Sequence, residues 1–483
     1  MNHSPTQSTL HSSVQENDSK PEEQVANRPS VSAGTYRGMD LLHGSITSSL
    51  WKFATPLIFS FFAQVVYVWI DTFFISHLGP AAISAAGVCE QIMFFTFTLG
   101  GGFATGTAII VARRIGEGRR AEAEHIASQS INATFLSGAV LAIVLYTFLP
   151  FLLHLLGLKD DVEMYALAYM SMVLLGLPFN LLIFQTNAIA RASGDSPFAM
   201  KVLFTSTLLN IAFAPLFIFG YGPVPAMGMH GAGLATAMAI FLSALLSVWR
   251  IFSHQSGLHI VFEFALPKWE IVRRVLTLGI PASLQMLCIS MTRISIFAIV
   301  SSFGLAVTTA YTLGMRMDFI IFMPILGFGI ALETITAQNL GAKQPERVMQ
   351  FYRTAIIQVG SLMMLAGLLL FVCSDYFARL FVQDSTVLSA LHGYLSVSVF
   401  GYPLFVIGVL SVRLLSGAGK PFVSLGVVVV SFVCVQFPLA YVLAHYTQLA
   451  STGIWLGVMG SYCTFAGGSA WFVLRKRWVT AVV

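Results

Sequence analysis

Charged side chains inside long apolar stretches are the residues of this sequence best placed to do chemistry. The chain has 21 acidic and 26 basic residues, and only a few of them fall within such stretches. These few are Asp71, Glu90, Arg293, Arg316, Asp318 and Glu333. A charged group at the centre of a membrane costs about 2.5–3.5 kcal/mol on insertion scales, so such groups usually serve a function.

Asp71 is the strongest of these candidates. It is the only Asp, Glu, Lys or Arg between Pro56 and Gly79, a stretch long enough to cross a membrane. Its carboxylate can take up and release a proton, or it can coordinate sodium together with neighbouring oxygens. It can also be a structural acid that accepts a hydrogen bond from a neighbouring helix. We favour the functional interpretation.

The other charged residues within the apolar stretches each have two interpretations. Glu90 is expected at the mouth of a cavity or near the membrane surface. Arg316 and Asp318 are two positions apart, so on a helix they cannot face each other. Arg293 is a candidate partner for Asp318, in an internal ion pair or in a substrate site. Glu333 is expected near the cytoplasmic end of its helix.

Motifs for enzymatic chemistry are missing. The segment 417–421, GAGKP, has Leu414 where a phosphate-binding loop needs Gly and Pro421 where it needs Ser or Thr. The five cysteines form no CxxC pair, and the histidines show no zinc-site spacing. The sequence therefore predicts no enzyme, no cofactor, no metal and no nucleic-acid partner, and it favours an ion gradient as the energy source.

Composition identifies the elements that must hold these residues. The chain of 483 residues is 56% hydrophobic and only 10% charged, whereas soluble proteins average about 25% charged residues. We therefore predict an all-α integral membrane protein with twelve transmembrane helices. The predicted spans are 53–78, 81–111, 124–150, 164–189, 200–219, 231–253, 279–302, 307–337, 351–373, 387–412, 423–444 and 453–474.

The distribution of Lys and Arg predicts the orientation. With the N-terminus inside, 22 of the 26 basic residues lie in inside segments and two lie in outside loops. Basic residues favour the cytoplasmic side, so both termini are expected there. We predict a disordered cytoplasmic tail (1–45), an N-lobe (46–253), a cytoplasmic linker (254–278), a C-lobe (279–475) and a second cytoplasmic tail (476–483).

The two halves repeat at a constant offset of 225 residues. Matched pairs include Pro56 with Pro281, Gly79 with Gly304, Gly102 with Gly327, Gly116 with Gly341, Tyr169 with Tyr394 and Pro178 with Pro403. Each half has an even number of spans, so the halves are parallel repeats related by a pseudo-twofold axis along the membrane normal. Two such lobes can rock against each other and expose a central cavity to one side at a time. Asp71 has no acidic counterpart, because Ile296 occupies its repeat position.

This layout, together with several short motifs, resembles the multidrug and toxic compound extrusion (MATE) family. The motifs are YVWIDTFFISHLG in the first span, NAIARASGDSPFAM after the fourth, GAGLAT in the sixth and AQNLGAKQPER after the eighth. The resemblance covers residues 48 to 475. It implies efflux of organic cations or drugs in exchange for protons or sodium, and it favours the DinF-like over the NorM-like branch.

The resemblance also implies a set of site residues. Carried over to this sequence, the ion-coupling site of the DinF-like branch comprises Asp71, Tyr67, Asn187, Asn210 and Thr236. Pro56 matches a proline that is thought to let the first helix bend. The family often has a second Asp four residues after the Asn of span five, but here Ala214 stands at that position. One carboxylate is enough for one proton, so we favour proton coupling over sodium coupling.

Two alternatives remain. One is a flippase for a lipid-linked oligosaccharide or another amphiphile, and the other is a membrane-embedded transferase. A cavity for an anionic headgroup should be strongly basic, but the spans offer only Arg293 and Arg316 against four acids. A cationic or neutral small-molecule substrate is therefore favoured. We expect a monomer in the lipid bilayer of a bacterial inner membrane.

Overall fold

Helices joined by short turns account for nearly all of the chain that the computed structural model describes. The described residues are 39–158, 160–253, 258, 260, 266–379 and 383–479. Twelve helical segments run through them, and eleven are long and apolar enough to cross a membrane. The predicted all-helical membrane fold is confirmed. The predicted disorder of 1–45 falls mostly on residues 1–38, which lie outside the described residues, as do parts of the predicted linker and 480–483 of the second tail.

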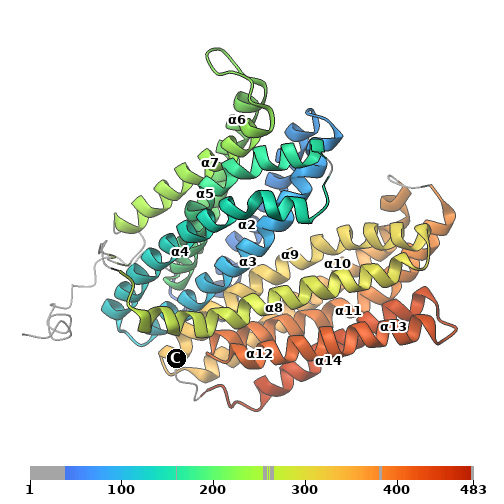
Figure 1. Cartoon of the computed structure of the whole chain (residues 1–483). Helices are drawn as coiled ribbons and strands as arrows, with labels where there is room; N and C mark the ends of the chain where they lie inside the picture. Colours follow the sequence, from blue (N-terminus) through green and yellow to red (C-terminus); the bar gives the residue numbers. More distant parts are fainter. Residues whose placement is uncertain are drawn as a thin grey trace, which may run out of the picture. The chain divides into compact units, whose positions relative to one another are not determined.

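The helices alternate in direction along the chain (Figure 1). Those of the N-lobe are α2 (Ile46–Ser76), α3 (Pro80–Gly116), α4 (Arg120–Leu155), α5 (Asp160–Ala192), α6 (Ser196–Phe219) and α7 (Gly228–Phe252). Those of the C-lobe are α8 (Trp269–Ser301), α9 (Leu305–Gly341), α10 (Pro345–Arg379), α11 (Ser385–Gly417), α12 (Pro421–Val428), the π-helix η1 (Val429–Gln436), α13 (Phe437–His445) and α14 (Ser451–Leu474). The segments α12, η1 and α13 are continuous and form one span. α8 begins at Trp269, within the segment that the sequence assigns to the linker.

The same turn starts the second helix of each lobe. Gly79, with φ 103°, precedes α3, and Gly304, with φ 92°, precedes α9. Glycine adopts these positive φ angles without the steric cost that a Cβ would bring. Gly79 is followed by Pro80, whose fixed φ suits the first position of a helix. These glycines are a repeat pair, so the repetition in sequence is also a repetition of backbone geometry.

The two lobes repeat the same packing around one central helix. In the N-lobe, α5 contacts α3, α4 and α7, and in the C-lobe its counterpart α11 contacts α9, α10 and α14. The contacts between lobes are also paired, since α3 packs on α8 and α9 packs on α2. This exchange of partners agrees with the predicted pseudo-twofold relation between the halves.

The first helix of each lobe crosses from one lobe to the other. Near its start, α2 buries Leu50 and Phe53 in a core cluster made by α9, α10 and α11, whereas Ile75 near its end packs in the N-lobe. α8 does the reverse, with Val275 in an N-lobe cluster and Ile296 in the C-lobe. Each lobe therefore completes its core with a half-helix from the other.

The lobes pack closely against each other at one end of the helices. We call it the basic end, because it carries Arg113, Arg114, Arg191 and Arg347. A Cβ on the paired glycines Gly116 and Gly341 would come closer than 3.0 Å to backbone atoms of the other lobe. A side chain in either position would therefore force the two lobes apart here.

Candidate functional site

Asp71 lies on α2 in the half away from the basic end, and only 7% of its surface is exposed. The hydroxyl of Tyr169, on α5, donates a hydrogen bond of 3.2 Å to Asp71 Oδ2. Asp71 Oδ1 is buried and has no hydrogen-bond partner among the described residues. A buried acceptor left unpaired costs about 1–3 kcal/mol. This oxygen is therefore ready to receive a proton or an ion.

A second group of polar side chains lies beside this carboxylate. Thr236 Oγ1, on α7, accepts hydrogen bonds from the hydroxyl of Tyr67 (3.3 Å) and from Asn210 Nδ2 (3.2 Å). Tyr67 is on α2, one turn before Asp71, and interacts with it electrostatically. Asn210, on α6, is fully buried, and its Oδ1 has no partner among the described residues. The structure thus brings together three helices and four of the five predicted coupling residues.

Asn187 is the member of the predicted set that lies elsewhere. It is on α5, as is Tyr169, but eighteen positions further along the chain. At 1.5 Å per residue this corresponds to about 27 Å, so Asn187 is close to the basic end. It is buried there, and its Oδ1 also lacks a partner among the described residues. Its distance from Asp71 is too great for direct coordination of the same ion.

Two further positions define the charge around Asp71. Ala214, where the family resemblance leads us to expect Asp, is fully buried on α6 among Ile75 and Ile218. α6 therefore contributes no carboxylate. Glu90, on α3, is exposed and lies near enough to Asp71 for the two carboxylates to interact electrostatically. Among the described residues, Glu90 is the acid that acts electrostatically on Asp71.

The chemistry open to this site follows from its donors and acceptors. Among the described residues, no group of three or more His, Cys, Asp or Glu side chains is arranged to hold a metal ion. The buried oxygens of Asp71, Asn210 and Thr236 suit a proton or a hard monovalent cation rather than a transition metal. Sequence reasoning missed Tyr169 as a partner of Asp71. Its signal was present, because Tyr169 is matched in the repeat by Tyr394.

Asp318 lies on α9 and has two direct partners. The hydroxyls of Tyr394 (2.5 Å) and Tyr402 (2.7 Å), both on α11, donate to its two carboxylate oxygens. Arg293, the candidate partner from the sequence, makes no ion pair with it among the described residues and instead lies 5.4 Å from the centre of the Phe319 ring. The guanidinium acts on Asp318 only from a distance. Tyrosine hydroxyls thus take the place of the expected salt bridge.

The remaining charged candidates are also placed. Glu333 accepts a hydrogen bond of 2.9 Å from Arg413 Nη1 near the basic end, in an ion pair between α9 and α11. Arg191 of the N-lobe interacts electrostatically with the same carboxylate. Arg316 is exposed on α9. Glu333 is therefore part of a charged cluster near the joint between the lobes and lies far from Asp71.

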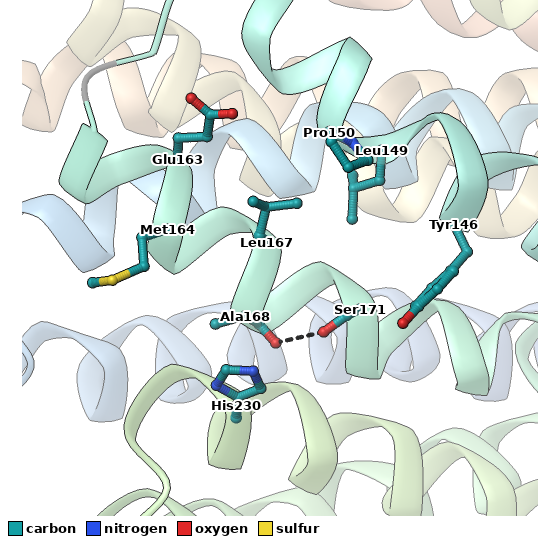
Figure 2. A pocket seen from close by; sticks show the side chains of 9 residues that line it. All are labelled: Tyr146, Leu149, Pro150, Glu163, Met164, Leu167, Ala168, Ser171 and His230. Carbon is teal, nitrogen blue, oxygen red and sulfur yellow. Dashed lines mark hydrogen bonds between the residues drawn. The ribbon is translucent and has the colours of Figure 1, made fainter.

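A hollow of about 610 Å³ lies at the ends of α4, α5 and α7 that are remote from the basic end (Figure 2). Its wall is formed by Tyr146, Leu149, Pro150, Glu163, Met164, Leu167, Ala168, Ser171 and His230. None of the predicted coupling residues lines it. Ala168 is the neighbour of Tyr169 in the sequence, but the two side chains differ in their surroundings, since Tyr169 contacts Asp71.

Comparison with known proteins agrees with this architecture. The sequence profile of the MatE family matches residues 56–216 and 281–442, one segment in each lobe. The chain belongs to the MatE family. Its members are membrane transporters and not enzymes, and both matched segments begin at the prolines of the repeat, Pro56 and Pro281.

Relatives of this MatE chain extend over nearly its whole length. The probable multidrug resistance protein YoeA of Bacillus subtilis is 25% identical, over 91% of this chain and 96% of its own. The multidrug export protein MepA of Staphylococcus aureus is 22% identical, over 89% and 95%. A solved structure described as the outward-facing conformation of a MATE family transporter of the MOP superfamily is 24% identical, covers 93% of this chain and 100% of that one, and has a TM-score of 0.84. This likeness shows the fold.

Proposed function

We propose that this protein is a secondary active antiporter that exports organic cations or drugs in exchange for protons, by alternating access between its two lobes. The observation that carries the proposal is the state of Asp71. Its carboxylate is buried and, among the described residues, has one neutral donor and keeps one oxygen without a hydrogen-bond partner. A carboxylate in this position can bind a proton when it is open to one side of the membrane and release it when open to the other.

Proton coupling is preferred to sodium coupling because of the number of charged ligands. Among the described residues, Asp71 is the only acid with a hydrogen bond to the Tyr67, Tyr169, Asn210 and Thr236 group, through Tyr169, and Ala214 supplies no carboxylate. A single carboxylate is neutralised completely by one proton. A sodium ion would need several more oxygen atoms to coordinate it directly. The predicted ligand Asn187 lies too far from Asp71 to supply one of these oxygens.

The substrate class rests on the relatives and on charge. Curated relatives named as multidrug resistance and multidrug export proteins support a drug or organic-cation substrate. The coupling site in the N-lobe supports the DinF-like branch. The clustering of Arg residues at one end supports a cytoplasmic position for that end and for both termini, in the inner membrane of a bacterium.

The test is transport in proteoliposomes with an imposed pH or sodium gradient. We expect a proton gradient to drive uptake of a cationic dye by the wild type, and we expect Asp71→Asn to reduce uptake to the level of empty liposomes. Asp384→Asn, the same change at an exposed acid before α11, is the matched control and should transport normally.

Three results would contradict parts of the proposal. Full transport by Asp71→Asn would exclude the coupling role of this acid. Transport driven only by a sodium gradient would exclude proton coupling. Failure to move any cation, together with translocation of a lipid-linked oligosaccharide, would favour the flippase alternative.

A further inference from the structure

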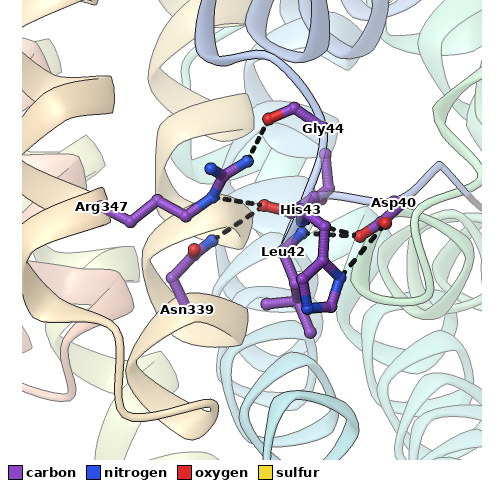
Figure 3. Close-up of polar contacts among 7 residues, drawn as sticks. Asp40, Leu42, His43, Gly44, Asn339 and Arg347 are labelled. Atoms are coloured by element: carbon purple, nitrogen blue, oxygen red, sulfur yellow. Dashed lines mark hydrogen bonds and ion pairs between the residues drawn. The ribbon is translucent and has the colours of Figure 1, made fainter.

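The residues that lead into α2 contact both lobes at the basic end, and Figure 3 shows their contacts with the C-lobe. We call Met39–Ser45 the strap. It precedes the first helix of the N-lobe in sequence, but most of its contacts are with the C-lobe. Its position matters because the two lobes pack closely together at the basic end, and an alternating-access transporter must open there.

The strap is fastened to the C-lobe by several interactions. The carbonyl oxygen of Leu41 accepts hydrogen bonds from Asn339 Nδ2 (3.3 Å) and from Arg347 Nε (3.5 Å). Arg347 also donates to the carbonyl oxygen of Gly44. The side chain of Leu41 is 1% exposed and packs in the same core cluster as Leu340 and Val348. Polar and apolar contacts thus hold the strap to α9 and α10.

Among the described residues, one hydrogen bond joins the strap to the N-lobe, and it is between backbone groups. The N–H of Met39 donates to the carbonyl oxygen of Gly194, at 3.2 Å, in the turn between α5 and α6. Directly beside it, Gln338 Nε2 of α9 donates to the carbonyl oxygen of Ala192, at 2.7 Å. The consecutive residues Gln338 and Asn339 therefore contact the N-lobe and the strap, respectively.

The strap is a formed turn and not a loose end. Asp40 Oδ1 accepts hydrogen bonds from the backbone N–H groups of Leu42 (2.9 Å) and His43 (3.0 Å). A Cβ at Gly44 would come within 3.0 Å of Ser49 Oγ, so the turn is packed against the start of α2. Hydrogen bonds within the strap fix its shape. A movement of the strap at Arg347 can therefore also move Met39.

The segment that leads into α8 makes a similar crossing. The N–H of Lys268 donates to Gln129 Oε1, on α4 of the N-lobe, at 3.0 Å. Lys268 precedes the first helix of the C-lobe, as the strap precedes the first helix of the N-lobe. Each lobe's entry segment is therefore attached to the opposite lobe, which is a second indication that these segments serve the joint between lobes.

We propose that the strap is a clasp that keeps the basic end closed in this conformation, and that it must release Gly194 before the basic end can open. The proposal rests on alternating access as proposed above. Since the strap has several attachments to the C-lobe and one to the N-lobe, the Met39–Gly194 bond breaks first and the strap moves with the C-lobe.

The experiment measures opening of the basic end and does not require transport. The native cysteines are replaced, and Ala192→Cys places one small thiol at the buried joint, where Ala192 is fully buried. A water-soluble maleimide then reports how often the joint opens. In this background, Met39→Pro removes the N–H that binds Gly194, and Met39→Ala retains it.

We expect Met39→Pro to raise the alkylation rate by about 2- to 10-fold over Met39→Ala, the range that one hydrogen bond supplies. Arg347→Ala should raise it at least as much, and its matched control is Arg353→Ala, an exposed arginine on the same helix. Size-exclusion profiles and thermal unfolding of each variant would establish that it is folded.

Equal alkylation rates in Met39→Pro and Met39→Ala would overturn the clasp, as would equal rates in Arg347→Ala and Arg353→Ala. Adding Asp71→Asn distinguishes the two proposals. If Asp71→Asn transports normally but the strap variants still open the joint, the coupling role fails and the clasp remains.

Discussion

Each lobe holds one buried aspartate against a tyrosine at the same repeat position. Tyr169 donates to Asp71 in the N-lobe, and Tyr394 donates to Asp318 in the C-lobe. The tyrosines are repeat counterparts, but the acids are not, because Asp71 comes from the first helix of its lobe and Asp318 from the second. Equivalent tyrosines in the two lobes therefore bind aspartates that come from non-equivalent helices.

The two acids differ in how completely they are satisfied. Both oxygens of Asp318 accept a hydrogen bond, from Tyr394 and Tyr402. The surroundings are aromatic, with Tyr394 packed edge-on against Tyr311 and Trp455. In the described part of the chain, Asp71 instead keeps one oxygen without a hydrogen-bond partner, next to polar side chains. We infer that Asp318 is a structural acid and that Asp71 is an exchangeable one.

The sharpest test of this difference is the same substitution in both lobes. Asp71→Asn should abolish gradient-driven transport, whereas Asp318→Asn should keep it and instead lower the unfolding temperature. The larger change Asp318→Ala leaves two buried hydroxyls without an acceptor and should cost about 2–4 kcal/mol of stability. Dye uptake and thermal unfolding in detergent measure the two effects. Loss of transport in a well-folded Asp318→Asn would break the distinction.

Removing the paired hydroxyls gives a smaller effect of the same kind. Tyr169→Phe deletes the only described donor to Asp71 and should slow transport by about 5- to 10-fold, which is within the range expected for the loss of one ordinary hydrogen bond. Tyr394→Phe leaves Asp318 with Tyr402 and should cost about 1 kcal/mol of stability at unchanged transport. If both variants slow transport equally, the two tyrosines contribute equally to transport, and the distinction between Asp71 and Asp318 is wrong.

The smallest effect concerns the start of the helix that carries Tyr394. Hydrogen bonds from the side chain and backbone N–H of Thr386 lower the pKa of Asp384 below its ordinary value. A lowered pKa means that this group stabilises the fold above its unfolded pKa of about 3.9 and loses that contribution as the pH falls through its folded pKa.

The unfolding temperature of the wild type should therefore exceed that of Asp384→Asn slightly near neutral pH. The difference should shrink as the pH falls and vanish once the pH is below the lowered pKa of Asp384 in the folded protein. A difference that persists in acid would mean that the carboxylate charge is not its source.

Much of the fold follows from sequence patterns alone. Twelve apolar stretches predict twelve helices because a backbone in lipid must satisfy its own hydrogen bonds. The residues repeated at one offset predict two lobes, and in the structure one repeated pair, Gly116 and Gly341, lies at the joint between them. These features are local or repeated, so one chain carries enough information to locate them.

The site is only partly predictable, because it depends on which side chains meet across helices. Asp71, Tyr67, Asn210 and Thr236 are brought near one another, but Asn187 is not, and eighteen residues of helix after Tyr169 explain why. The pairing of Arg293 with Asp318 is absent for a similar reason. Two tyrosines on α11 donate hydrogen bonds to the carboxylate of Asp318. The spacing of residues along α8 and α9 cannot predict which side chains of α11 will contact it.

The crossing of α2 into the C-lobe has a consequence for biosynthesis. Phe53 is buried in the same core cluster as Phe328, which the ribosome makes 275 residues later. At a synthesis rate of about 5–20 residues per second, the start of α2 waits roughly 15–55 s for this partner. Until then its apolar face has only lipid or the insertion machinery to contact. The N-lobe is thus the first part of the protein to enter the membrane, but its first helix cannot complete its packing until the C-lobe has been made.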